Sequence, residues 1–392
     1  MSKLNKIFFG PAGTGKTRQA IIEAVEIVKD SNNKKDLKLI KDGGNYSKII
    51  EVFNSLSTLQ PLNLEDTVTD KNRLKKIMED IHSSKNIDNV VTEHLGYIDS
   101  LGSRSIIKSK FLEYRFYPLI ETVTFHPSYS YQDFVEGLTV KNNDKKQIEY
   151  VVKDGIFKRI CNRARANQNY NYVLIIDEIN RGDISSIFGE LFTLLEDDKR
   201  EGESETLSIN LPYSKDEIGN PKKLIVPSNL YILATMNTVD KSIALIDVAL
   251  RRRFDFQECM PIYDNKIFPK YKGIDLSKLL KSINDRITVL KNEHYQIGHS
   301  YFLKITNKTE LKEVMENDIL PLLKEYFYDD WKSICAVLHQ DYNNPKNGFL
   351  IAETINKSNF KKEFHDLIEY SNKTTFKINP KFTEQDIISI YE

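Results

Sequence analysis

Two short stretches of the sequence combine glycine, cationic and acidic residues in an order that could perform chemistry. The first is Gly10-Pro-Ala-Gly-Thr-Gly-Lys-Thr17, and the second is the acidic pair Asp177–Glu178 at the end of the apolar run 173–176. Adjacent carboxylates at the end of a buried strand cost free energy unless a cation lies beside them. The sequence therefore raises the question of which cation that is.

The first stretch matches G-x(4)-G-K-[ST], the pattern of a phosphate-binding loop. Glycines allow successive backbone N–H groups to converge on an anion. Lys16 would reach the β- and γ-phosphates, and the Thr17 hydroxyl would ligate Mg²⁺. A strand pattern at 4–9 before the loop and a helical pattern at 17–30 after it favour a functional site over a chance match. The predicted cofactor-binding residues of this loop are Pro11, Ala12, Gly13, Thr14, Gly15, Lys16 and Thr17.

The cation beside the acidic pair would then be the magnesium ion of a bound nucleotide. Asp177 is predicted to hold the Mg²⁺ together with Thr17, and Glu178 to polarise the attacking water. Neighbouring strand residues point in opposite directions, which favours two separate roles. The structural alternative is that the acids cap the following helix. That alternative is better for Asp183, which directly precedes an amphipathic stretch and is predicted to be an N-cap.

Two further sets of candidate catalytic residues lie at the end of a third strand pattern, at 230–237, and after it. Asn237 ends that strand, and its amide could orient the attacking water between the acidic pair and the γ-phosphate. The run Arg251-Arg252-Arg253 comes next, and it has two interpretations. The arginines could complement a helix dipole, or they could project into a neighbouring subunit and stabilise transition-state charge there.

The elements that position these residues indicate an α/β protein with a parallel sheet, because strand, glycine loop and helix follow one another at the start. We predict an α/β nucleotide-binding domain at 1–258 with a mostly helical insertion at 31–120, and a small helical domain at 259–392. The further elements expected in the first domain are strands at 120–126 and 172–178, helices at 154–167 and 243–254, an amphipathic stretch at 183–200, and a hairpin turning at Gly219-Asn220.

Composition excludes several function classes. The 56 basic and 56 acidic residues balance, so any contact with nucleic acid has to be a local patch. The three cysteines and seven histidines show no ligand spacing, which argues against a zinc enzyme and for a reducing compartment. No apolar run is long enough to cross a bilayer or to form a signal peptide. We therefore expect a cytoplasmic protein with no membrane partner.

Linked stretches of this sequence resemble AAA+ NTPases, and more narrowly the McrB subunits of McrBC-type modification-dependent restriction systems. The stretches are "GPAGTGKT", "TFHPSYSYQDFVEG", "LIIDEINRGDISSIFGELFTLLE", "ATMNTVDKSIALIDVALRRRF" and "IGHSYF". The resemblance implies an AAA+ phosphate-loop fold with a C-terminal helical lid. It also implies GTP rather than ATP as substrate, Mg²⁺ as cofactor, a hexameric ring of identical subunits, and a McrC-like nuclease partner through which the complex acts on DNA.

The resemblance also implies roles for individual residues. Asp177 and Glu178 correspond to the Walker B pair, and Asn237 to the water-orienting residue, with Asp240 nearby. Arg252 and Arg253 would be the arginine fingers that act in trans, with Arg251 a weaker candidate. His299 in "IGHSYF" is a further weak candidate for a contact near the nucleotide.

The sequence departs from the McrB pattern in one respect, and it leaves one alternative function open. McrB proteins often carry a DNA-recognition domain ahead of the motor, whereas here the phosphate loop starts at Gly10, so direct recognition of modified bases by this chain is doubtful. The alternative function is a MoxR-like, ATP-driven remodelling chaperone that acts on proteins. The "FHPSYSYQDFVEG" and "MNTVDKS" blocks favour the McrB-like interpretation.

Overall fold

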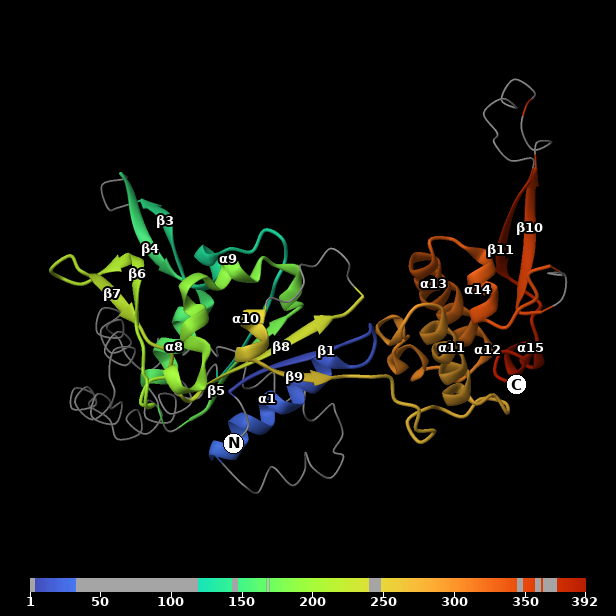
Figure 1. Ribbon diagram of the computed structural model, residues 1–392, viewed down its shortest axis with the longest axis horizontal. Coiled ribbons are helices and arrows are strands. Elements are labelled where there is room, and N and C mark those ends of the chain that lie inside the picture. Colours follow the sequence, from blue (N-terminus) through green and yellow to red (C-terminus); the bar gives the residue numbers. More distant parts are fainter. Residues whose placement is uncertain are drawn as a thin grey trace, which may run out of the picture. The chain divides into compact units, whose positions relative to one another are not determined.

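The computed structural model describes residues 4–32, 119–142, 147–166, 168, 170–239, 248–343, 348–356, 361 and 372–392 (Figure 1). The insertion predicted at 31–120 lies outside the described residues, apart from two residues at each end. Asp240 also lies outside them. Among the residues that are described, no helix is both long and apolar enough to cross a membrane.

A five-stranded sheet with the order β2-β5-β8-β1-β9 forms the core of the first part of the chain. Adjacent pairs β2–β5, β5–β8 and β1–β9 are parallel, as the sequence predicted. Central strand β5 is buried from Tyr172 to Ile176, as expected for a parallel sheet covered on both faces. The strands are β1 (Asn5–Gly10), β2 (Ile120–Thr124), β5 (Tyr172–Asp177), β8 (Leu230–Asn237) and β9 (Asp255–Glu258).

Helical segments connect these strands. They are α1 (Lys16–Asn32), α7 (Tyr131–Phe134), α8 (Ile156–Ala166), η2 (Ile179–Arg181), α9 (Ile184–Phe188), η3 (Gly189–Leu195), η4 (Asp197–Lys199) and α10 (Val248–Arg253). The amphipathic stretch at 183–200 is α-helical only as far as Phe188. Gly189 then takes a φ of 51°, and the chain continues in tighter 3₁₀ turns.

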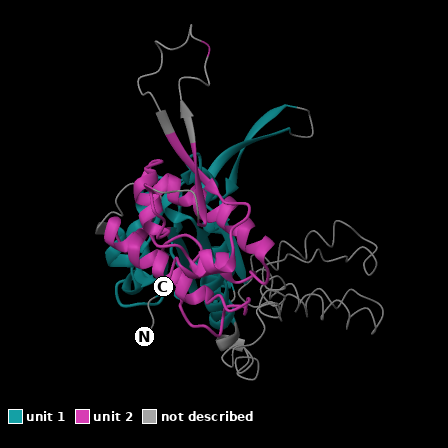
Figure 2. Ribbon diagram, turned by 90° about the vertical axis from the view of Figure 1, so that its right-hand side faces the viewer, with its two compact units in different colours: residues 1–9, 16–236, 242–258 teal, residues 10–15, 237–241, 259–392 magenta. Residues whose placement is uncertain are grey.

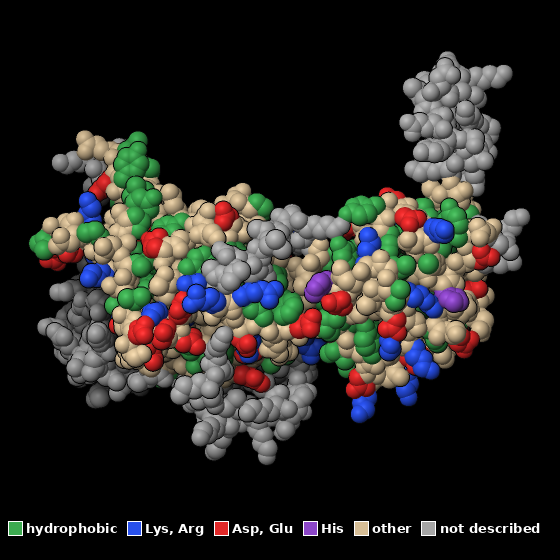
Figure 3. All heavy atoms as spheres, in the orientation of Figure 1, with side chains coloured by type: hydrophobic (Ala, Val, Ile, Leu, Met, Phe, Trp, Pro, Cys, Tyr) green, Lys and Arg blue, Asp and Glu red, His purple; other side chains and the backbone are tan. Residues whose placement is uncertain are grey.

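Two antiparallel hairpins project from this α/β part. One joins β6 (Ile209–Lys215) to β7 (Pro221–Leu224), which confirms the hairpin predicted around Gly219-Asn220. The other joins β3 (Glu136–Asn142) to β4 (Ile148–Asp154) and was not predicted. Figure 3 shows apolar side chains gathered along this second hairpin, where Leu138, Val140, Ile148, Tyr150 and Val152 are exposed.

The chain divides into two compact units (Figure 2). Unit 1 comprises residues 1–9, 16–236 and 242–258, and unit 2 comprises 10–15, 237–241 and 259–392. Unit 2 therefore combines most of the phosphate loop and the turn after β8 with the C-terminal segment.

The C-terminal segment is mainly helical around one apolar core. Its longest helix, α11, is capped by Asp275 and buries Leu279, Leu280, Ile283 and Ile287 on one face. The antiparallel pair β10–β11 was not expected in this region. The elements are α11 (Leu276–Leu290), η5 (Glu293–Tyr295), η6 (His299–Phe302), α12 (Lys308–Val314), the π-helical η7 (Met315–Ile319), α13 (Leu320–Phe327), α14 (Trp331–Val337), β10 (Leu350–Asn356), β11 (Asn372–Ile378) and α15 (Glu384–Ile388).

Candidate nucleotide site

The phosphate loop lies between β1 and α1, where the sequence predicted it. Gly13 has a φ of 75°, a conformation that glycine adopts without cost. The buried Thr14 hydroxyl donates a hydrogen bond of 3.0 Å to the carbonyl of Pro11 within the same loop. Lys16 and Thr17 follow directly as the first residues of α1, so the loop leads into a helix N-terminus, where anions are favoured.

In unit 1, Asp177 at the end of β5 receives two hydroxyl groups. Thr17 Oγ1 donates to Asp177 Oδ1 at 3.1 Å, and Thr235 Oγ1 donates to the same oxygen at 2.5 Å. The parallel register pairs Ile176 with Ala234, which brings Thr235 of β8 beside Asp177. The role of Thr235 was not predicted from the sequence. Its only signal was one polar residue inside an apolar strand, and the register between strands was needed to interpret it.

These residues fit a magnesium ion. Mg²⁺ prefers oxygen ligands in octahedral geometry with bonds of about 2.1 Å, so two neighbouring ligands lie about 3.0 Å apart. The oxygens of Thr17 and Asp177 are separated by 3.1 Å. Thr17 and Asp177 would hold the ion, which would neutralise charge on the nucleotide phosphates.

Glu178 has an unusual backbone conformation. Its φ of 52° and ψ of 47° lie in the left-handed region, which costs a non-glycine residue on the order of 1 kcal/mol. Its N–H donates to Thr235 Oγ1 at 3.1 Å, and its carboxylate lies 3.5 Å from Nε of Arg181. The left-handed turn directs the Glu178 side chain differently from an ordinary strand residue. Backbone strain of this kind concentrates at functional sites.

Asp183 is the N-cap of α9 and has no role in this group. Its carboxylate accepts the N–H of Ser186 at 3.1 Å and the Ser186 hydroxyl at 2.7 Å. These hydrogen bonds, the one from the hydroxyl foremost, hold the pKa of Asp183 below its ordinary value. The predicted N-cap is therefore confirmed.

In unit 2, Asn237 begins a turn that contacts the start of the phosphate loop. The N–H of Thr238 donates to the carbonyl of Gly10 at 3.1 Å. Asn237 Oδ1 lies 3.4 Å from the N–H of Val239. The Thr238 hydroxyl lies 3.4 Å from the carbonyl of His294. Asn237 is thus joined to the phosphate loop through one main-chain hydrogen bond of its neighbour.

The three arginines at the end of α10 differ in their surroundings. Arg251 is exposed, with its guanidinium 5.5 Å from the centre of the Phe256 ring. Arg252 is exposed. Arg253 is largely buried and forms an ion pair of 2.7 Å with Glu196 of its own chain. Of the two predicted fingers, Arg252 is therefore the more accessible to a neighbouring molecule.

The two histidine-containing blocks pack within the chain. In the first, Tyr129 stacks on Phe125 with 5.0 Å between ring centres, and burial above all raises the pKa of Tyr129 to about 12. Tyr131 donates to Glu190 at 2.9 Å. In the second, the buried His299 accepts the N–H of Ile262 at its Nδ1, at 3.2 Å. This ring nitrogen is therefore occupied in linking two segments of unit 2.

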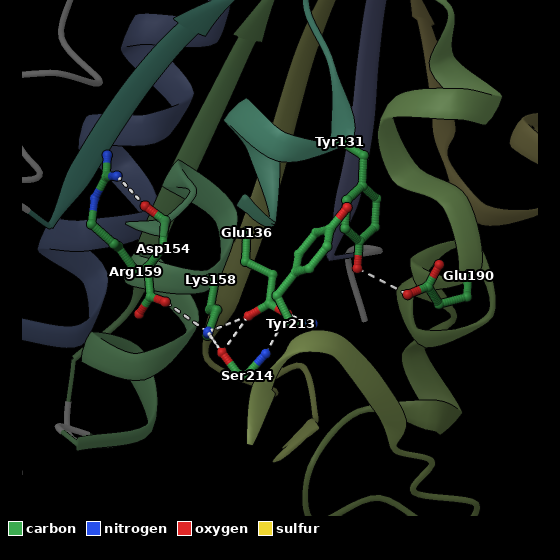
Figure 4. A network of polar contacts seen from close by, with 8 residues as sticks. All are labelled: Tyr131, Glu136, Asp154, Lys158, Arg159, Glu190, Tyr213 and Ser214. Carbon is green, nitrogen blue, oxygen red and sulfur yellow. Dashed lines mark hydrogen bonds and ion pairs between the residues drawn. The ribbon is translucent and has the colours of Figure 1, made fainter. Parts of the chain in front are cut away.

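A second polar cluster lies at the base of the β3–β4 hairpin, where the turn end of β6 contacts it (Figure 4). Glu136 is fully buried and accepts hydrogen bonds from Lys158 Nζ at 2.6 Å, from the backbone N–H groups of Tyr213 and Ser214 at 2.8 and 3.0 Å, and from the Ser214 hydroxyl. Lys158 also pairs with Asp154 at 2.6 Å. The cluster joins β3, α8 and β6 and is structural.

Comparison with known proteins assigns the chain to a family. Residues 110–254 match the AAA domain (dynein-related subfamily), and residues 275–335 match the alpha-helical lid domain of McrB. The component YdiS of the type II restriction enzyme BsuMI from Bacillus subtilis (strain 168) is 30% identical over 240 residues, which span 52% of this chain and 68% of that protein. The chain belongs to the McrB-like AAA+ proteins.

A second McrB-like relative is the EcoKMcrB subunit of the type IV methyl-directed restriction enzyme of Escherichia coli (strain K12). It is 37% identical over 233 residues, which cover 54% of this chain and 48% of that subunit. The matched residues thus span about half of the length of that subunit. A solved structure from Cytophaga hutchinsonii aligns with 14% identity over 70% of this chain and 75% of its own, but the TM-score of 0.24 is too low to establish a shared fold.

Proposed function

We propose that this McrB-like chain is the nucleotide-hydrolysing motor subunit of a McrBC-like restriction system. In this proposal the chain hydrolyses GTP in preference to ATP, assembles in the cytoplasm as a hexameric ring, and drives a McrC-type nuclease that cuts DNA. Membership of the McrB-like family supports the proposal, and both curated relatives are named as restriction enzyme components. The match to the McrB lid favours this role over that of a MoxR-like chaperone.

The observation that carries the proposal is the group around Asp177. Thr17 and Asp177 present two oxygens at a separation that suits Mg²⁺, and Thr235 positions that carboxylate. Bound Mg²⁺ would supply charge stabilisation at the phosphates. Glu178 would then accept a proton from the attacking water, because it adjoins Asp177 and is turned away from the strand direction.

The remaining predicted residues complete the proposed roles. The phosphate loop from Pro11 to Gly15 would bind phosphate oxygens through its N–H groups, and Lys16 through its ammonium group. Asn237 would orient the attacking water. Arg252 would act on the nucleotide of a neighbouring subunit. Arg253, which is paired with Glu196, would stabilise the fold of its own chain.

The deciding experiment measures hydrolysis of GTP and of ATP by the purified chain, with and without a McrC-type nuclease. We expect faster turnover of GTP than of ATP and stimulation by the nuclease. A strong preference for ATP with no effect of the nuclease would contradict the proposal. Lys16→Ala provides the background rate.

A matched pair of variants tests the metal ligand. Thr17→Ser keeps the hydroxyl group and should retain hydrolysis with a normal Mg²⁺ requirement. Thr17→Ala removes it and should raise the Mg²⁺ concentration needed for half-maximal rate about tenfold. This factor corresponds to the loss of one polar contact to the ion. Equal Mg²⁺ requirements in the two variants would argue against Thr17 as a ligand.

A further inference from the structure

The phosphate loop of unit 2 is hydrogen-bonded by a short segment of the C-terminal region, Gly298–Tyr301, which we call the strap. The N–H of Gly298 donates to the carbonyl of Ala12 at 2.9 Å. The N–H of Ser300 donates to the carbonyl of Gly13 at 3.1 Å. Two consecutive carbonyls of the loop are therefore bound by main-chain donors from the strap.

These two hydrogen bonds also determine where the N–H groups of the loop point. A peptide unit is planar and trans, so the carbonyl of one residue and the N–H of the next point in opposite directions. Holding the carbonyl of Ala12 thus directs the N–H of Gly13 to the other side, and holding the carbonyl of Gly13 does the same for the N–H of Thr14. The Thr14 hydroxyl holds the carbonyl of Pro11 in the same way. The N–H groups of Ala12, Gly13 and Thr14 therefore point away from the groups that hold these carbonyls. Successive N–H groups of this kind are what an anion-binding nest is built from.

The strap approaches so closely that one of its residues has to be glycine. A Cβ atom on Gly298 would lie 1.9 Å from the carbonyl carbon of Gly13 and 2.5 Å from the carbonyl oxygen of Ala12. Gly298 itself has a φ of −70°, which any residue can adopt. The requirement for glycine therefore comes from space alone. On the loop side, a Cβ on Gly13 would meet the Tyr301 ring at 2.6 Å.

We propose that the strap holds the phosphate loop in its anion-binding conformation, with Gly298 and the N–H of Ser300 as positioning groups. The strap would thereby set the affinity for the polyphosphate of the nucleotide without touching it. This inference rests on the proposed nucleotide-binding function and adds a group that acts from behind the loop. Because it acts on phosphate-binding N–H groups, its contribution is the same for every nucleobase.

Two substitutions at one position test the proposal. Ser300→Pro removes the N–H that binds Gly13, and Ser300→Ala keeps it. Ser300 is the second residue of η6, in the first turn, where N–H groups have no partner within the helix, so proline removes no hydrogen bond of the helix itself. Dissociation constants are measured on the full chain for GTP, ATP and inorganic tripolyphosphate. We expect Ser300→Pro to weaken all three about tenfold, as for the loss of one hydrogen bond. Ser300→Ala should bind as the wild type does.

Gly298→Ala is the second test, because it leaves all N–H donors in place and only adds a methyl group. We expect it to weaken the same three ligands about tenfold or more through displacement of Gly13. Circular dichroism and the melting temperature without ligand report on folding of Gly298→Ala and of Ser300→Pro. We expect wild-type spectra, with a melting temperature lowered by a few degrees in Gly298→Ala because the added methyl group displaces backbone atoms.

The outcomes separate the strap from the proposed function. If the wild type binds the three ligands and Ser300→Pro binds them as tightly as Ser300→Ala, the strap has no positioning role although the proposed function stands. A loss for GTP and ATP without a loss for tripolyphosphate would also overturn the proposal, since the effect would then act through the nucleoside. If the wild type binds none of them, the proposed function fails and the role of the strap fails with it.

Discussion

Glu136 and Asp177 are acidic side chains of the same unit with opposite surroundings. Glu136 is fully buried, and an ammonium, a hydroxyl and two backbone N–H groups donate to its carboxylate. Asp177 is half-buried at the end of β5 and takes two threonine hydroxyls on one oxygen. A carboxylate whose counter-charge is supplied by its own chain stabilises the fold. A carboxylate that is met by neutral hydroxyls can still receive a cation from a ligand.

The arginines at the end of α10 repeat this contrast. Arg253 is paired with Glu196, whereas Arg252 is exposed. Charges satisfied within the chain and charges presented to ligands or neighbours thus lie side by side in sequence. Substitutions on the two sides of this division should therefore affect different measurements, namely stability on one side and turnover on the other.

The largest effect should come from Arg252→Ala. If Arg252 acts as a finger in a neighbouring subunit, its loss should lower kcat about 10³-fold or more. The melting temperature should not change, because the side chain is exposed. Arg253→Ala is the matched variant, and it should lower the free energy of unfolding by about 1 kcal/mol through loss of the pair with Glu196. A destabilised Arg252→Ala with normal kcat would reverse the assignment.

Glu178→Gln should have the next largest effect. The amide keeps the shape of the side chain but cannot accept the proton of the attacking water, so kcat should fall about 10²- to 10⁴-fold. Nucleotide binding and assembly should persist, which equilibrium binding and sedimentation would measure. Turnover at the wild-type rate would show that Glu178 is not the general base.

Local interactions were predictable from the sequence. The phosphate loop is a contiguous pattern, and the cap at Asp183 reaches only three residues, to Ser186. The parallel sheet followed from the succession of strand, glycine loop and helix at the start of the sequence. In each of these cases the residues that interact, or the pattern that identifies them, lie within a few positions of one another.

Interactions that depend on strand register or on a single backbone angle were not predictable. Thr235 meets Asp177 across 58 positions, so its role depends on how β5 and β8 align. The end of α9 depends on the positive φ of Gly189, within a stretch whose apolar periodicity continues beyond it. Strand β9 has only four residues, too few to show an alternating pattern. The strap contact joins Gly298 to Ala12, which no local pattern could indicate.

Glu136→Gln alters a charge that is satisfied within the chain, and it should be strongly destabilising. It removes one of the two carboxylates beside the buried Lys158, Asp154 being the other, and places an amide NH₂ against groups that donate to Glu136. An unsatisfied buried polar group costs about 1–3 kcal/mol. Urea unfolding of the full chain measures this loss. Asp285→Asn is the control, because its pair with Lys281 is exposed and should leave the urea midpoint unchanged. A loss of less than about 1 kcal/mol for Glu136→Gln would remove the contrast with Asp177.

The smallest effect should be a dependence of stability on pH that comes from Glu136. Burial by itself raises the pKa of this carboxyl, but the hydrogen bonds from Lys158, Ser214 and Tyr213 outweigh burial and hold the pKa below its ordinary value of 4.5. The unfolded chain therefore binds the proton at a higher pH than the folded chain does. The stabilisation is complete above pH 4.5 and is lost as the pH falls from there through the folded pKa, by at most about 1.4 kcal/mol per pH unit.

The difference in unfolding free energy between the wild type and Glu136→Gln isolates this contribution, because the other carboxyl groups titrate in both proteins. We expect that difference to be constant from pH 7 to about pH 5 and to shrink below pH 4.5. A difference that stays constant to pH 3 would mean that the folded and unfolded chains share the same pKa at Glu136, so that its contacts do not lower it. A difference that grows as the pH falls from 7 to 5 would mean that burial outweighs the hydrogen bonds and raises the folded pKa, and Glu136 would then be less fully satisfied by its own chain than its contacts indicate.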